Sequence, residues 1–388
     1  MTDLAPDPSS DLAGDLTSDL TSDLLPEGLE DRLTQSAAAA ERIERAVLEQ
    51  MHAHGYDRVR PPLIEFEKSL LRRMAGVSTR HLFRFVDPRS LRMLALRSDM
   101  TPQVGRIAAT GLAGKPRPLR LSYAGQVTRM IGDQLDPRRE ALQLGAEIIG
   151  SDSAEAAAEL VELAIASLEA AGASGISVDF TLPDLVDTLA AAELPLEPAQ
   201  RAAVRRELDA KDAGGLRDAG GAAYIPLLYA TGPFDEAAAK LEKLDAAGAL
   251  ASRIAGLRRI AARVQGRARL TLDPCERHGF EYQTWFGFMI YAEGLRGALG
   301  RGGTYCILGT NEPATGFSLF PEDLVEAAKA GERLGEKVFL PLGHDQSSAV
   351  RLRAEGWRTL AALSATDDPA ALGCSHILAG NAAHPLQS

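Results

Sequence analysis

Two segments near the middle of the chain alternate apolar and polar residues with the period of two that is typical of β-strands. They run from Arg120 to Arg129 and from Glu140 to Gly150, and the polar stretch 130–139 between them contains Gly-Asp and Asp-Pro turn signals. The pattern predicts a β-hairpin. In its second strand, one side carries the apolar residues and is expected to face the core; these residues are Leu142, Leu144, Ala146 and Ile148.

The other side of this second strand is polar. Gln143, Gly145 and Glu147 share it, and the glycine leaves room above the sheet between two polar side chains. Two interpretations are open. The polar side of an antiparallel strand ordinarily faces solvent, which the pattern alone favours, but the same residues would also suit the floor of a binding site.

Other patterns flank the hairpin. Apolar residues at helical spacing over residues 33–54 predict a helix that ends at Gly55. The segment Tyr56–Glu65 predicts a strand broken by two prolines, which places it at a sheet edge or an interface. Residues 83–97 predict a second hairpin with its turn at Asp87-Pro88.

The second half of the chain predicts a helix over residues 154–171, with Asp152 and Glu155 as a capping box and Gly172 as its end. Residues 184–266 are Ala-rich and predict a helical insertion. Further elements are expected as strands at 269–273, 280–292 and 305–308, a strand that passes into a helix at 315–325, and a β-α-β pattern over the last 50 or so residues.

Composition suggests three regions. Residues 1–25 carry a low-complexity Ser-Asp-Leu-Thr repeat and are predicted to be a disordered acidic tail, with a partner-docking helix as the alternative. Residues 26–330 are expected to form one α+β domain that contains the insertion 184–266. Residues 331–388 are expected to form a small α/β region. Because they are too few for a typical independent domain, we expect this region to pack against the larger domain.

Charge and cysteine content exclude several classes of protein. The net charge is −11, but the first 31 residues hold nine acids and no Lys or Arg, so the remainder is nearly neutral, and the charge argues neither for nor against a nucleic-acid-binding surface. No apolar run reaches the roughly 18 residues that span a bilayer. Three isolated cysteines and the absence of paired metal-ligand motifs argue against disulfides or a metal site and suit a reducing cytoplasm.

Four segments, in this order, resemble motifs of the histidyl-tRNA synthetases, a branch of the class II aminoacyl-tRNA synthetases. Leu96–Thr101 resembles Leu-Arg-Pro-Glu-Gly-Thr, and the strand around Arg129 with Gln143–Glu147 resembles motif 2. His278–Thr284 resembles the histidine-specific Arg-Gly-Leu-Asp-Tyr-Tyr-Thr, and Gly302–Cys306 resembles Gly-Gly-Arg-Tyr-Asp. The likeness covers roughly residues 26–330 and implies a class II synthetase-like antiparallel sheet flanked by helices.

The departures from that family concern its catalytic cations. His278 takes the place of the catalytic arginine, although Arg277 is adjacent, and Thr304 and Cys306 replace the Arg and Asp of Gly-Gly-Arg-Tyr-Asp. Asp323 stands where motif 3 has the arginine that grips ATP. Losing one such cation typically costs on the order of 10²-fold in rate. The resemblance therefore implies a chain that makes no adenylate.

The amino-acid pocket of the family is nonetheless matched. The histidine-binding residues that the resemblance implies are Asp99, Thr101, Arg129, Gln143, Glu147, His278, Tyr282 and Gln283. In these roles Asp99, Thr101 and Gln143 accept hydrogen bonds from the α-ammonium, and Arg129 offers a fork of donors to the carboxylate.

The ring of the ligand would meet a different set. Glu147 would bind one imidazole nitrogen, and Tyr282 or Gln283 the other. His278 and Gln283 differ from the family pattern and alter one wall of the pocket.

This combination resembles the ATP phosphoribosyltransferase regulatory subunits. Members of that family join the short-form catalytic subunit of the first enzyme of histidine biosynthesis and take part in feedback by histidine. The resemblance implies a cytoplasmic, non-catalytic subunit without a cofactor, L-histidine as effector, and a homodimer that contacts itself through Tyr56–Glu65.

Two alternatives stay open. One is a divergent, active histidyl-tRNA synthetase, for which the basic stripe Arg258, Arg259, Arg263, Arg267 and Arg269 would touch RNA, although such a stripe is more often a solvated helix face. The other is a stand-alone histidine sensor with a different partner.

Overall fold

A computed structural model describes residues 24–72, 82–132, 136–277, 283–331 and 335–386. These residues divide into two compact units, a large one within residues 24–33 and 39–327 and a small one within residues 34–38 and 328–386. None of the helices in these ranges is long and apolar enough to cross a membrane.

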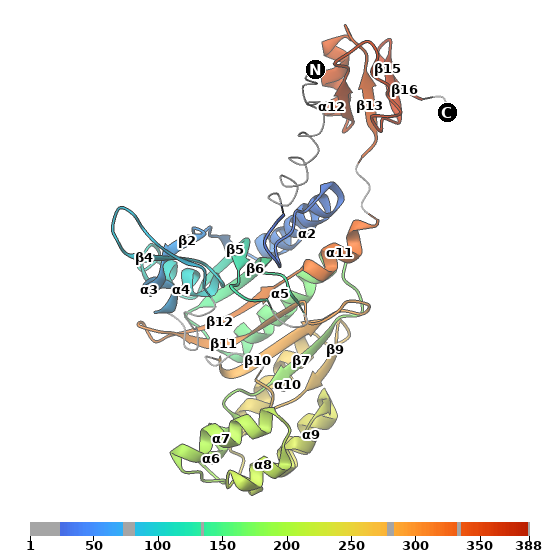
Figure 1. The fold of residues 1–388 in the computed structure, drawn as a ribbon. Helices are drawn as coiled ribbons and strands as arrows, with labels where there is room; N and C mark the ends of the chain where they lie inside the picture. The colour runs from blue at the N-terminus through green and yellow to red at the C-terminus, as the bar shows by residue number, and fades with distance from the viewer. Residues whose placement is uncertain (1–23, 73–81, 133–135, 278–282, 332–334, 387–388) are drawn as a thin grey trace, which may run out of the picture. The chain divides into compact units, whose positions relative to one another are not determined.

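A nine-stranded sheet forms the centre of the large unit (Figure 1), in the order β1-β5-β6-β12-β11-β10-β7-β9-β8. All neighbours from β5 to β7 are antiparallel, which confirms the predicted α+β class. The strands are β1 (Asp57–Arg58), β5 (Leu119–Thr128), β6 (Glu140–Ile149), β7 (Ser177–Thr181), β8 (Gly232–Pro233), β9 (Arg269–Leu272), β10 (Gln283–Tyr291), β11 (Gly300–Ile307) and β12 (Glu312–Leu319).

The predicted hairpin is confirmed as β5 and β6. Both faces of β6 are buried: Leu144 is 0% exposed on one side, and Gln143 and Glu147 are 0% and 1% exposed on the other. The interpretation of a solvent-exposed polar face is therefore wrong. Helix α5 (Ala154–Ala170) packs on the apolar side, and helix α4 (Thr101–Ala109) packs on the polar side.

The proline-broken strand is split between two sheets. Its first part is β1, at the edge of the large sheet, and its second part is β2 (Ile64–Phe66), which pairs with β4 (Met93–Leu96). Strand β3 (Arg84–Val86) completes a three-stranded sheet in the order β2-β4-β3. The predicted edge position and second hairpin are thus confirmed, as is helix α2 (Thr34–Ala53), which precedes β1; helix α3 (Glu67–Leu71) follows β2.

Three expectations need correction. The N-cap of α5 is Ser153, whose side chain accepts from the backbone N–H of Ala156, so Asp152 is not the cap. Strand β11 begins at Gly300, so the glycine-rich stretch belongs to the strand instead of preceding it. Neighbouring atoms lie so close that Cβ atoms would not fit at these glycines. Strand β7 was not expected from the sequence.

The region 184–266 is mainly helical, as predicted. Its elements are α6 (Leu185–Ala190), α7 (Pro198–Asp209), α8 (Ala213–Asp218), the 3-10 helix η2 (Ala222–Tyr229), α9 (Phe234–Leu244) and α10 (Ala251–Arg263), with β8 before α9. Helix α10 packs on α5, which ties this region to the sheet.

Helix α11 (Glu322–Lys329) follows β12 and leads into the small unit. There β13 (Lys337–Leu340), α12 (Gln346–Ala354) and β14 (Arg358–Ala361) form the predicted β-α-β pattern with a parallel strand pair. Strand β15 (His376–Ala379) also pairs with β13 in parallel, and β16 (Ala382–Pro385) closes the sheet.

Tyr56 joins three elements of the large unit. This residue lies between the end of α2 and the start of β1, and its hydroxyl donates to Glu159 of α5 at 2.8 Å. Arg120 of β5 binds the same carboxylate at 2.7 and 2.8 Å. Because Tyr56 is 1% exposed, its hydroxyl has exchanged water for this single charged acceptor.

We expect Tyr56→Phe to lower the free energy of unfolding by about 1.5–3 kcal/mol, the usual range for a hydrogen bond to a charged group. Urea unfolding would measure it, with Tyr229→Phe as the control because Tyr229 is 69% exposed. Equal stability of the two variants would contradict the role given to Tyr56.

Candidate functional site

Tyr123 lies at the centre of a buried polar cluster on the sheet face that α4 covers. Its hydroxyl donates to Oε1 of Glu147 at 3.1 Å and lies 3.1 Å from Oγ1 of Thr101 and 3.2 Å from Oγ of Ser318. Tyr123 is 0% exposed, and burial raises the pKa of its phenol well above the ordinary value. The phenol therefore stays neutral and keeps a proton to donate.

The room above Gly145 that the sequence suggested is filled by this tyrosine. Tyr123 is the cross-strand partner of Gly145, and a Cβ atom on Gly145 would lie 2.3 Å from Cζ of the phenol ring. Gly145 is thus required so that Tyr123 can lie flat against β6 between Gln143 and Glu147. The glycine serves close packing and does not by itself create a cavity.

Glu147 is a buried carboxyl with two tyrosine partners. Tyr305 donates to Oε2 at 2.9 Å, while Tyr123 binds Oε1. Burial raises the pKa of Glu147 to about 8, with the charge of Asp99 adding to the effect and the two tyrosine hydrogen bonds opposing it. At neutral pH the carboxyl is mostly protonated, and a ligand that supplies donors or positive charge would favour its ionised form.

Asp99, Thr101 and Gln143 form a second part of the cluster. The backbone N–H of Thr101 and the side-chain amide of Gln143 both donate to Oδ1 of Asp99 at 2.8 Å. The same amide donates to Ser318 at 2.8 Å, and its oxygen accepts from the backbone N–H of Met100 at 2.9 Å. The structure therefore brings these three predicted residues together, with Gln143 holding the loop that carries Asp99.

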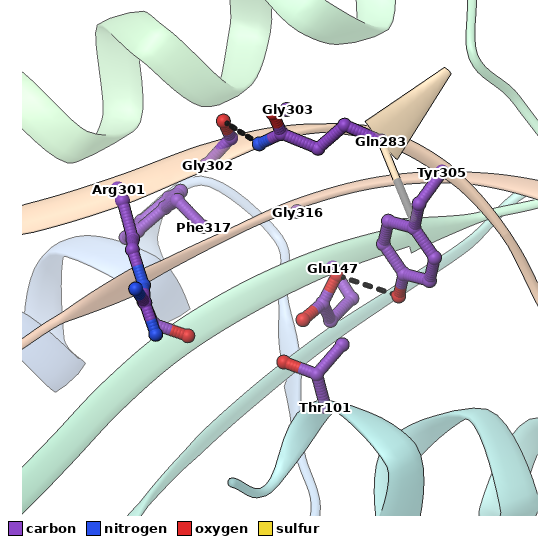
Figure 2. A pocket seen from close by; sticks show the side chains of 10 residues that line it. Thr101, Glu147, Gln283, Arg301, Gly302, Gly303, Tyr305, Gly316 and Phe317 are labelled. Atoms are coloured by element: carbon purple, nitrogen blue, oxygen red, sulfur yellow. Dashed lines mark hydrogen bonds between the residues drawn. The ribbon is translucent and has the colours of Figure 1, made fainter. Parts of the chain in front are cut away.

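A small cavity opens beside this cluster (Figure 2), with a volume of about 20 Å³. This is roughly the space of one water molecule. The amide of Gln283 takes up part of the floor, where it donates to the carbonyl of Gly302 at 2.9 Å. The side chains that line the cavity are those of Thr101, Glu147, Gln283, Arg301, Tyr305, Phe317 and Ser318.

Arg129 does not line this cavity. It lies in a separate groove of about 640 Å³, where its guanidinium is 5.8 Å from the centre of the Phe320 ring. His278 and Tyr282 lie outside the described residues. Arg277, considered from the sequence as a shifted catalytic arginine, lines yet another cavity, with Leu208 and Cys275.

The larger groove contains Asp323, at the position of the missing ATP arginine. Its carboxylate accepts from Arg138 at 2.9 Å, and Arg138 also binds Asp136 at 2.6 Å. Acidic side chains outnumber basic ones among the described lining residues; the acids are Glu30, Asp136, Glu140, Glu322, Asp323 and Glu326, and the bases are Arg129, Arg138, Arg139 and Arg296. Such a lining disfavours a triphosphate.

Sequence reasoning missed Tyr123, Ser318 and Arg301 as parts of the site. Pairing the predicted hairpin symmetrically about its loop 130–139 sets Tyr123 opposite Ala146, one residue from its observed partner Gly145, so the sequence did not reveal its place in the site. Ser318 and Arg301 depend on the pairing of β12 with β6 and β11, which no local pattern reveals. Among the described residues, no group of His, Cys, Asp or Glu is arranged to hold a metal ion.

The fold and the sequence of this chain are similar to those of known proteins. Residues 28–324 match the family model described as histidyl-tRNA synthetase. A solved structure from Bacillus halodurans, named an ATP phosphoribosyltransferase regulatory subunit/histidyl-tRNA synthetase, superposes with a TM-score of 0.77 at 23% identity, covering 90% of this chain and 96% of that one. A histidyl-tRNA synthetase from Nostoc gives 0.74 at 16% identity over 92% and 90%.

Sequence relatives narrow the assignment. The protein named ATP phosphoribosyltransferase regulatory subunit from Rhodospirillum centenum is 41% identical, over 93% of this chain and 96% of its own length. The protein of the same name from Paramagnetospirillum magneticum is 44% identical, over 91% and 95%.

The fold and the buried cluster thus define a histidyl-tRNA synthetase-like domain of class II architecture. Within that class, the chain belongs to the family of ATP phosphoribosyltransferase regulatory subunits.

The raised pKa of Glu147 has a consequence for stability. Between the ordinary carboxyl pKa of 4.5 and about 8, the folded state binds a proton that the unfolded state has lost, so this group makes stability fall as pH rises through that window. Glutamine cannot ionise. We expect the stability of Glu147→Gln relative to the unsubstituted protein to increase from pH 5 to pH 8.5, by on the order of 3–5 kcal/mol.

Melting temperatures measured across this pH range without ligand would check the expectation. Glu355→Gln is the matched control, because its side chain is 51% exposed. A difference between Glu147→Gln and the unsubstituted protein that does not change with pH would contradict it.

Proposed function

We propose that this chain activates the short-form catalytic subunit of ATP phosphoribosyltransferase and conveys feedback by L-histidine, while catalysing no reaction itself. The names of the relatives support the partner. The observation that carries the proposal is the convergence of Thr101, Gln143 and Glu147 on one buried cluster beside a cavity, at the positions that resemble the amino-acid pocket of the synthetases.

In the proposed complex, Glu147 accepts a hydrogen bond from the imidazole, and Asp99 with Thr101 accepts from the α-ammonium. A buried carboxylate gains most from such donors, because water does not compete for it. The cavity of about 20 Å³ holds about one water molecule, so histidine binding would require lining side chains to move, and we propose that Gln283 on the floor is one of them. Histidine then regulates only if the inhibited complex binds it more tightly than the active one.

The charges of the larger groove support the proposal that this chain forms no adenylate. Arg138 is neutralised by Asp136 and Asp323, so it cannot stabilise negative charge that develops on a phosphoryl group. We therefore expect no histidine-dependent ATP–pyrophosphate exchange, and exchange at a synthetase-like rate would favour the divergent synthetase instead.

The basic stripe also fits a non-synthetase. Among the described residues, four of its five arginines, all but Arg269, form ion pairs of 2.5–2.9 Å with acids, so most of the stripe is not a free positive surface. The pairs are Arg258–Glu242, Arg259–Glu155, Arg263–Glu162 and Arg267–Glu169. Three of them link α10 and the turn after it to α5, so these cations are largely neutralised and offer little to RNA phosphates.

Phosphoribosyl-ATP formation by the short catalytic subunit tests the proposal directly. We expect a large rise in rate when this chain is added, and histidine should reverse it. Glu147→Ala should weaken inhibition by histidine at least about tenfold, since the lost charged hydrogen bond is typically worth more than 1.4 kcal/mol, and should leave activation in place. Glu355→Ala serves as the control.

Two results would contradict the assignment. If Glu147→Ala lost activation as well while remaining folded, the site would not be a histidine site. If this chain bound histidine but formed no complex with the catalytic subunit and left its rate unchanged, the stand-alone sensor would be favoured.

We further propose a homodimer in which the three-stranded sheet takes part, since β2 ends the predicted Tyr56–Glu65 contact segment. Ile64 and Phe85 lie on one face of this sheet, because their cross-strand partners on β4 are Leu96 and Leu94. They are 43% and 41% exposed, so the face presents apolar side chains to its surroundings.

Ile64→Asp and Phe85→Asp should each convert the dimer to monomer, because an unpaired carboxylate would be buried at the contact. Sedimentation velocity would measure this. Leu363→Asp is the control, since Leu363 is 94% exposed in the small unit. A dimer that survives both substitutions would place the contact elsewhere, and an unsubstituted protein that sediments as a monomer would contradict the dimer.

A further inference from the structure

Arg301 introduces positive charge at the small cavity. Of the described residues that line it, Arg301 alone has a basic side chain. We propose that Arg301 binds the carboxylate of an α-amino acid in this cavity, in place of Arg129. The inference rests on the proposed function, because it concerns the same ligand, but it assigns a residue that the resemblance to the synthetases did not indicate.

The strand register puts Arg301 and Glu147 on the same face of the sheet. Gly303 of β11 pairs with Gly316 of β12, which in turn pairs with Glu147 of β6. Arg301 lies two residues before Gly303, so its side chain emerges on that same face. Two strand spacings of about 4.8 Å each separate β11 from β6, so the two Cα atoms are roughly 10 Å apart or somewhat more.

The floor between these two residues consists of glycines and the short side chain of Ser318, which is the cross-strand partner of Arg301. A Cβ atom on Gly316 would collide with the carboxylate of Glu147, and one on Gly303 would lie 2.8 Å from Nε2 of Gln283. Gly303 and Gly316 therefore leave space beside Glu147, and the small Ser318 adjoins Arg301. In Figure 2, Arg301 lies on one side of the pocket, and Glu147, Thr101 and Tyr305 lie on the other.

Phe320 lies between the cavity and the larger groove. The guanidinium of Arg301 is 5.9 Å from the centre of its ring, and that of Arg129 is 5.8 Å from it. One arginine lines the cavity and the other lines the groove. A carboxylate inside the cavity thus has Arg301 at its wall, whereas Arg129 belongs to the neighbouring space.

The chemistry of the cavity suits a zwitterion. An arginine offers a planar fork that binds a carboxylate through two parallel hydrogen bonds, and partial burial strengthens them. With its carboxylate at Arg301, an α-amino acid directs its ammonium toward Asp99 and Thr101 and its side chain toward Glu147. The site would then discriminate against an amine that has the same ring but no carboxylate.

Calorimetric titration with L-histidine and with histamine, which lacks the carboxylate, tests this. The unsubstituted chain should bind histidine about 10- to 100-fold more tightly than histamine, the usual effect of one charge-assisted hydrogen-bonded pair. Arg301→Met should remove most of that preference by weakening histidine and leaving histamine within about twofold. Arg129→Met, the matched control, should leave both affinities unchanged, and Arg301→Lys should fall between.

The outcomes separate this inference from the function on which it rests. Equal loss of histidine and histamine binding in Arg301→Met would overturn the carboxylate role, and so would selective loss in Arg129→Met. Equal affinity of the unsubstituted chain for the two ligands would overturn it without any variant, so misfolding cannot mask the result. If the unsubstituted chain bound neither ligand, the proposed histidine site itself would fall.

Discussion

The site depends on keeping one carboxyl group inside the sheet without an ion pair to any of the residues that the structure describes. Glu147 lies over Gly316, where a Cβ atom would collide with its oxygens, and it is held by the hydroxyls of Tyr123 and Tyr305. A buried carboxylate without a cation is costly, so the group keeps its proton at neutral pH. Glycine is needed at positions 145 and 316, because a Cβ atom at either one would overlap Tyr123 or Glu147.

The sequence predicted the hairpin and placed Gln143 and Glu147 on a common face, because a period of two depends only on the local backbone. It did not predict that this face is buried, since what covers a strand is not encoded in its own alternation, and here the cover is α4. The assignment of Arg129 to the pocket has a similar weakness. Strand β5 ends at Thr128, so alternation no longer determines where the next side chain points.

Two smaller differences have the same origin. Asp152 and Ser153 are both good N-caps, and a one-residue choice between them is made by tertiary packing rather than by local preference. The glycine-rich stretch 300–303 has the composition of a loop, yet it forms part of strand β11. Gln283 and Phe317 approach its backbone so closely that side chains would not fit at its glycines. Sequence patterns thus located the elements of the site but not the non-local contacts that complete it.

The cavity and the groove are separate spaces, as expected if the chain has lost adenylate formation and kept amino-acid binding, the function proposed above. The two spaces differ in their lining: in the groove Arg138 is paired with Asp136 and Asp323, whereas the cavity is lined by the buried carboxyl of Glu147 and by Arg301. Changes confined to the groove can remove nucleotide chemistry while the amino-acid contacts remain.

The amide of Gln283 lies over Gly303 on the cavity floor, where it would compete with any ligand for the same space. A tethered side chain acts at a high effective concentration, and any ligand must displace it before binding. The apparent dissociation constant then equals the intrinsic one divided by the fraction of molecules in which the amide has swung away. If histidine binds here as proposed, residue 283 sets the histidine concentration at which regulation begins, while the proposed ligand contacts stay the same.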